Sequence, residues 1–86
     1  MPEITRFFGI IIRMFYDDHN PPHFHAEFGG KKVVMDFRGN ILQGDLGSKT
    51  ALRLIREWSD LYQTELAEDW ELARASREIK KIAPLE

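Results

Sequence analysis

The sequence has no cysteine, and this absence removes several kinds of site at once. Without thiols there are no disulfides, no thiolate-bound metals and no cysteine nucleophile. The formal net charge is only −2, so the chain also lacks the strong overall basic field typical of non-specific nucleic-acid binding. A functional site must therefore be sought in a local cluster of other side chains.

Long apolar runs are also lacking. The longest near the N-terminus, residues 7–12, is too short for a signal peptide or a membrane span. We therefore expect a cytoplasmic, bacterial-type protein with no membrane partner. The 86 residues allow a single domain with a small core, which a homodimer would enlarge.

Three segments of this domain are predicted from hydrophobic periodicity. Residues 1–44 alternate in the manner of strands, and residues 4–16 are expected to form one of them. Residues 48–76 have helical spacing, begin at a good N-cap, Ser48, and break near residues 63–64. Residues 77–86 alternate weakly and are expected to add a late extended segment. The fold class is α+β, with an antiparallel meander of three or four strands packed on one face by C-terminal helices.

The core follows from the same patterns. Alternation along residues 4–16 assigns Met14 and Tyr16 to the core-facing side together with other apolar residues. The expected core joins both parts of the chain: Leu54, Ile55, Trp58, Leu61 and Leu66 from the helices, and Phe8, Ile10, Ile12, Phe24, Val33, Met35 and Phe37 from the sheet.

All three histidines lie in one block, "DDHNPPHFHAEFGG", at residues 17–30. Asp17, Asp18 and the Pro-Pro step indicate a stiff turn. Gly29-Gly30 is typical of a two-residue hairpin turn, and that turn sets Phe24 opposite Met35 and His23 opposite Asp36. The hairpin then sorts its side chains by face. The polar face is predicted to carry His23, His25, Glu27, Lys32 and Asp36, with Arg13 from the preceding strand.

Two imidazoles on one strand face suit acid–base chemistry, because imidazole gains and loses protons near neutral pH. We predict His23 and His25 as the catalytic pair, with Arg13 or Lys32 as the cation that stabilises a phosphorane. Asp36 is expected to bond the second ring nitrogen of His23. These groups would suffice for a metal-independent ribonuclease. A polar strand face beside a proline turn is also an ordinary structural feature, and the spacing does not separate the two interpretations.

A metal site is the second chemical interpretation. His23 and His25 could bind one divalent metal ion, with His19 as the third ligand. The sequence requires no cofactor, so this hypothesis stands beside metal-free catalysis.

The sequence resembles, over nearly its whole length, a small bacterial family called domain of unknown function forty-one-sixty. The residues that carry the resemblance are the opening "MPEI", the block at residues 17–30, the "REW" and "DW" tryptophan contexts and the final "KKIAPL". The resemblance implies a cytoplasmic single-domain protein. It also implies a gene beside that of another small protein, similar to a toxin–antitoxin pair with this family as the toxin. No catalytic residues carry over.

Two functional hypotheses result. In the first, the chain is the toxin-like member of a two-gene module and cleaves RNA through its histidine-lined face, with the neighbouring gene's product as its partner. In the second, it is a non-enzymatic regulator that binds a protein, RNA or DNA, in keeping with the transcriptional-regulator label that some family members carry. Salt-dependent binding without cleavage would favour the second hypothesis.

Overall fold

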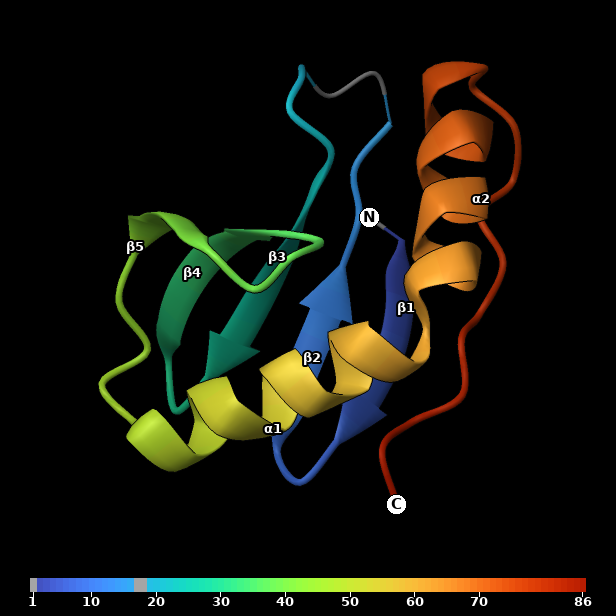
Figure 1. The fold of residues 1–86 in the computed structure, drawn as a ribbon. Coiled ribbons are helices and arrows are strands. Elements are labelled where there is room, and N and C mark those ends of the chain that lie inside the picture. The colour runs from blue at the N-terminus through green and yellow to red at the C-terminus, as the bar shows by residue number, and fades with distance from the viewer. Residues whose placement is uncertain (1, 17–18) are drawn as a thin grey trace.

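The computed structural model describes residues 2–16 and 19–86. It confirms the α+β class with one more strand than the sequence suggested. Five strands form one antiparallel sheet in the order of the chain, and two helices lie together on one side of it (Figure 1). The elements are β1 (Glu3–Phe7), β2 (Ile10–Arg13), β3 (His23–Phe28), β4 (Lys31–Asp36), β5 (Ile41–Gly44), α1 (Lys49–Leu61) and α2 (Gln63–Arg74).

The prediction of one strand over residues 4–16 is wrong. Phe8 and Gly9, with φ angles of 50° and 79°, form a tight turn that separates β1 from β2. Glycine supplies one of the two positive φ angles that such a hairpin turn requires. The turn reverses the chain and leaves Phe8 exposed instead of in the core. Tyr16, which follows the end of β2, is also exposed, whereas Ile10, Ile12 and Met14 are buried as expected.

The central hairpin confirms the predicted register. Gly29 and Gly30 both have positive φ, at 57° and 82°, and the pairing runs from Phe28 opposite Lys31 to His23 opposite Asp36. The core-facing residues Phe24, Ala26, Val33 and Met35 are fully buried. This hairpin therefore fixes the orientation of every side chain on the opposite face.

The helices also follow the sequence closely. The side chain of Ser48 accepts a hydrogen bond from the N–H of Ala51 at 3.1 Å, and the helix breaks at Tyr62, next to the predicted position. Trp58 is completely buried, with its ring 5.9 Å from Phe7 and 5.8 Å from Phe24. Leu61 was expected in the core but is 66% exposed, because it lies at the end of α1 on the solvent side of the break. Within the described residues, neither helix has the length and apolar character needed to cross a membrane.

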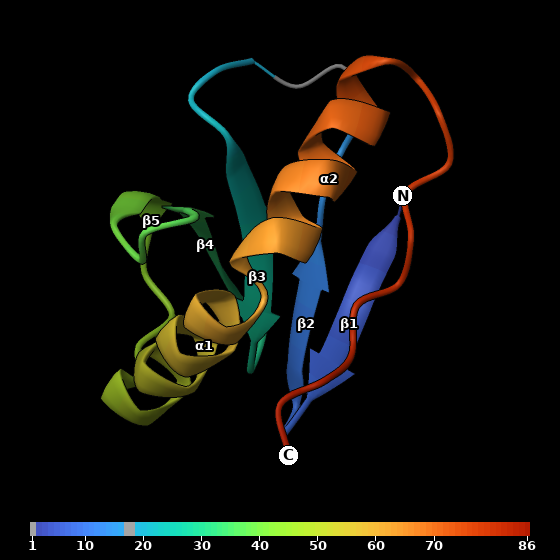
Figure 2. The same cartoon turned by 45° about the vertical axis from the view of Figure 1, so that its right-hand side comes forward.

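Residues 75–86 form no strand and cross the molecule as an irregular segment beside β1 (Figure 2). Residues 80–83 of this segment are held by hydrogen bonds to three other elements. Lys80 N–H donates to the carboxylate of Asp69 at 3.0 Å, Ile82 N–H to the carbonyl of Ile4 at 2.9 Å, and the Trp58 indole N–H to the carbonyl of Ala83 at 2.9 Å. Ile82 is buried. The segment expected to be extended at residues 77–86 forms no strand and is a tail that covers the β1 edge.

Candidate functional site

The side of the sheet away from the helices gathers the predicted polar residues. We call this side the outer face. Adjacent strands contribute to it in register: Arg13 lies opposite His25, which lies opposite Val34, which lies opposite Gln43. A hollow of about 570 Å³ lies here, the outer-face hollow, lined by Arg13, Phe15, His25, Ala26, Glu27, Lys32, Val33, Val34, Gln43 and Gly44.

Two cations share one carboxylate in this hollow. Arg13 pairs directly with Glu27, and the Lys32 ammonium lies 4.0 Å from the same carboxylate oxygen. The Lys32 side chain is 78% exposed, whereas Arg13 is held more closely by the sheet. Glu27 therefore orients a rigid guanidinium, and Lys32 adds a positive charge that can swing toward a ligand.

His25 is the imidazole at the centre of this surface. Its ring is half-buried and lies edge-on to Phe15, with ring centroids 4.3 Å apart and an interplanar angle of 87°. Arg13 is its cross-strand neighbour. An imidazole, a cation and an aromatic ring therefore share the same hollow.

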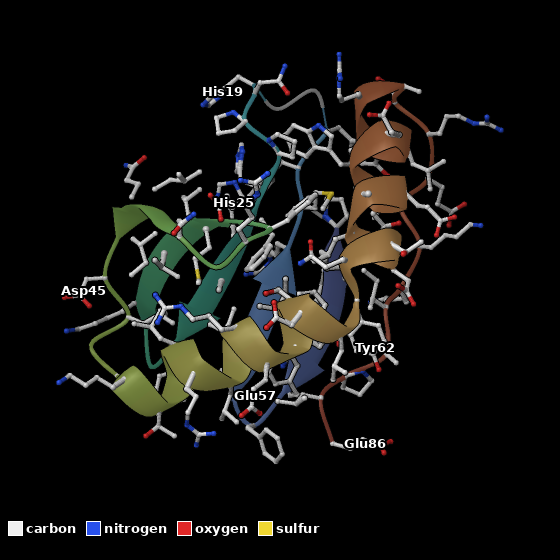
Figure 3. All side chains as sticks on the ribbon, in the orientation of Figure 1. His19, His25, Asp45, Glu57, Tyr62 and Glu86 are labelled. Atoms are coloured by element: carbon white, nitrogen blue, oxygen red, sulfur yellow. The ribbon has the colours of Figure 1, made fainter. Side chains whose placement is uncertain are left out.

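A second hollow of about 310 Å³ adjoins the first at residues shared by both, and we call it the loop hollow. It is lined by His19, Asn20, Pro21, His23, His25, Val34, Leu42 and Gln43. His19 lies on the segment that leads into β3, and His25 lies further along that strand (Figure 3). The His19 and His23 rings are 5.5 Å apart, and the His23 and His25 rings are 5.3 Å apart. The three imidazoles thus form a continuous row. Asp17 and Asp18, expected to form the turn before this row, lie outside the described residues.

His23 differs from the expectation of an exposed catalytic group. It is only 3% exposed, because Trp70 from α2 packs against its ring with centroids 5.3 Å apart. Its Nδ1 lies 2.7 Å from the carbonyl oxygen of Pro21. The helix covers one end of the polar strand face, and this contact between distant segments leaves no trace in local alternation.

Asp36 has a different task from the one predicted. It lies opposite His23 in the register, but its carboxylate accepts hydrogen bonds from the N–H groups of Arg38 and Asn40 and from the Asn40 side chain, at 2.9–3.0 Å. Partial burial pushes the pKa of Asp36 upward, but these hydrogen bonds outweigh it and hold the pKa below its ordinary value. Asp36 therefore orders the turn before β5.

The predicted metal site has no support from the geometry of the described residues. Within residues 2–16 and 19–86, no group of three histidine or carboxylate side chains is disposed to hold a metal ion. Adjacent rings of the row lie 5.5 Å and 5.3 Å apart.

Sequence reasoning missed the contribution of β5 to the site. Leu42 and Gln43 both line the loop hollow, and Gln43 also lines the outer-face hollow. A register shift between Val34 and Met35 sets two residues of β5 against one of β4. Alternation alone does not indicate such a bulge, although the strand itself was expected. Phe15, two residues after Arg13 in the chain, also lines the outer-face hollow.

The fold and the site define a small α+β protein in which an antiparallel sheet packs its helices on one face and presents cations, an imidazole and an aromatic ring on the other. Residues 9–71 match the family described as Domain of unknown function (DUF4160), and the chain belongs to this family. The match includes every outer-face residue named above. Comparison with curated proteins and with solved structures gave no match.

Proposed function

We propose that this protein is the toxin-like component of a two-gene module in the bacterial cytoplasm, and that it binds and cleaves single-stranded RNA on its outer face. The observation that supports the RNA site is the hollow of about 570 Å³ in which Arg13, Lys32, His25 and Phe15 meet. The toxin assignment is supported by the family resemblance and its implied gene arrangement. The partner is the small protein encoded beside it.

Binding follows from charge and stacking. Single strands are held by cations that contact phosphates and by aromatic rings on which bases stack. Lys32 extends into solvent and meets a phosphate, while Glu27 keeps the Arg13 guanidinium aimed along the sheet. The edge-to-face contact with His25 holds the Phe15 ring in place. The net charge of −2 makes this a local site rather than a broad basic surface.

Cleavage requires two proton transfers. In the proposed step His25 removes the proton from a ribose 2′-hydroxyl, the 2′-oxygen attacks phosphorus, and the bond to the 5′-oxygen breaks. The products are a 2′,3′-cyclic phosphate and a 5′-hydroxyl, whose proton comes from a second imidazole. His19 and His23 both line the loop hollow beside His25 and are the candidates for this donor. Lys32 or Arg13 stabilises the charge on the phosphorane.

The test is cleavage of a labelled single-stranded RNA in the presence of a chelator, with five variants compared. His25→Ala should lower the cleavage rate by about 10²-fold or more while RNA binding changes little. Lys32→Gln should weaken binding several-fold. Arg53→Gln is the matched control, because Arg53 lies on α1 and pairs with Glu57 at 3.1 Å, away from the outer face. His19→Ala and His23→Ala, compared at equal folded fraction, identify the proton donor.

Expression of the protein in cells without its partner should inhibit growth, and the His25→Ala variant should not. That outcome would extend the cleavage result to the cell. Full cleavage and toxicity in a double variant of His23 and His25 would place the chemistry elsewhere.

A non-enzymatic nucleic-acid-binding regulator is the alternative proposal, favoured by one observation. His23 is 3% exposed, so the pair predicted as acid and base contains one member with little access to a substrate. The cations and the aromatic ring remain available for binding. Intact RNA or DNA, bound with an affinity that falls steeply as salt increases, would support this alternative.

A further inference from the structure

The two edges of the sheet differ in how far other segments cover them. The β1 edge is covered by the C-terminal tail, whose Ile82 N–H bonds the carbonyl of Ile4. At the other edge all four residues of β5 are exposed, among them Ile41 and Leu42. Within the described residues, no further strand pairs with β5. An exposed apolar edge strand is a template for another strand.

The hydrogen bonds to β4 show which backbone groups of β5 face outward. The two residues that flank β5 direct backbone groups toward β4. The carbonyl of Asn40 accepts a hydrogen bond from the N–H of Asp36 at 3.0 Å, and the N–H of Asp45 donates to the carbonyl of Lys32 at 3.2 Å. Antiparallel strands alternate, so the neighbouring residues Ile41 and Gly44 direct their N–H and C=O groups outward. The bulge explains why two residues lie between them.

We propose that a second copy of this chain occupies this edge, with β5 paired antiparallel to β5 across a two-fold axis. The register that matches Ile41 of one copy with Gly44 of the other is self-complementary, since both residues face outward and the same pair recurs on the other side of the axis. The ends of β5 also carry opposite charges, Arg38 before it and Asp45 after it. Antiparallel pairing brings each end near the oppositely charged end of the second copy.

The covered β1 edge explains why a second copy forms a closed dimer. With one edge available per molecule, pairing stops at two copies and makes a ten-stranded sheet, whereas two open edges would permit a filament. Leu42 and Gln43 line the loop hollow, so the dimer sets the loop hollows of the two copies side by side at the axis. The dimer does not depend on RNA cleavage and can be tested without it.

The experiment measures mass in solution by light scattering after gel filtration, over roughly 1 µM to 1 mM protein. The wild type should move from the 10.1 kDa monomer to twice that mass. Ile41→Lys should stay monomeric, because charges on an edge strand oppose pairing. Leu61→Lys is the matched control: it also replaces an exposed apolar residue with lysine, on α1, and should dimerise like the wild type.

A second variant reports the register and does not depend on loss of binding. The chain has no cysteine, so Leu42→Cys introduces a single thiol next to the proposed axis. Mild oxidation should link two copies, since neighbouring strands bring Cα atoms within the roughly 4.4–6.8 Å that a disulfide requires. Leu61→Cys should not link. A wild type that is monomeric at every concentration, or an Ile41→Lys variant that dimerises normally, would overturn the proposal. A monomeric wild type would favour a strand of a different protein at this edge.

Discussion

The imidazole of His23 packs against the indole of Trp70, with ring centroids 5.3 Å apart. This contact joins the first residue of β3 to the middle of α2 and buries the histidine. His25, two residues further along the same strand, stays half-exposed on the outer face. One helix contact therefore separates two histidines that the sequence treats alike.

This difference predicts that two alanine variants lose stability to different degrees. His23→Ala removes a buried ring and should lower the free energy of unfolding by about 1–3 kcal/mol. His25→Ala removes a half-exposed ring and should cost less than about 1 kcal/mol. Urea denaturation followed by tryptophan fluorescence measures both. Equal losses would contradict the packing of His23 under Trp70.

Alanine substitutions at Gly44 and Gly30 give a second matched comparison of stability. Both have positive φ, at 89° and 82°, so alanine is strained at either position. A Cβ at Gly44 would lie 2.5 Å from the carbonyl oxygen of Lys32, whereas a Cβ at Gly30 meets nothing within 4 Å. Gly30→Ala should therefore cost about 1–2 kcal/mol and Gly44→Ala several kcal/mol more. Thermal unfolding measures the difference; similar melting temperatures would show that β5 does not approach β4 this closely.

The raised pKa of Asp69 predicts that stability falls as pH rises. Its side chain is 2% exposed, and burial raises its pKa despite the hydrogen bond from the Lys80 N–H. The folded state then binds the proton more tightly than the unfolded state, so stability decreases as pH rises from the unfolded pKa through the folded one. Asp69→Asn does not titrate and should gain stability relative to the wild type between about pH 4 and pH 7. A difference in unfolding free energy that stays constant with pH would contradict the prediction.

The lowered pKa of Asp36 predicts the opposite dependence of stability on pH. Its pKa is lowered because the hydrogen bonds from Asn40 and Arg38 outweigh the effect of partial burial. Its contribution to stability is present above the unfolded pKa and is lost as pH falls through the folded pKa. The wild type should therefore exceed Asp36→Asn at neutral pH and lose that advantage toward about pH 3. Denaturant midpoints at several pH values test this, and an advantage that grows in acid would exclude the turn role of Asp36.

Much of the fold could be predicted from local sequence patterns. Two adjacent glycines between alternating segments predicted the register from His23 to Asp36, and Ser48 predicted the start of α1. Both depend on interactions within a few residues, where backbone geometry and side-chain chemistry are decisive. The turn at Phe8 and Gly9 was missed because a single glycine inside a continuous apolar run gives a weak turn signal.

The candidate site was predicted only in part. Alternation placed Arg13, His25, Glu27 and Lys32 on one face, and the outer-face hollow brings them together. Alternation could not show that Asp36 serves its own turn. The catalytic roles, the partner and RNA as the substrate remain predictions.

The sequence by itself determined the α+β class, the central hairpin and the division of its side chains between two faces, because periodicity and turn residues act locally. Only the tertiary structure decided which polar residues stay accessible. Trp70 covers His23, the bulge adds Leu42 and Gln43 to the hollows, and the C-terminal tail covers one edge of the sheet. Each of these depends on contacts between segments far apart in the chain, and the free energy of such contacts comes from burial that local sequence patterns do not encode.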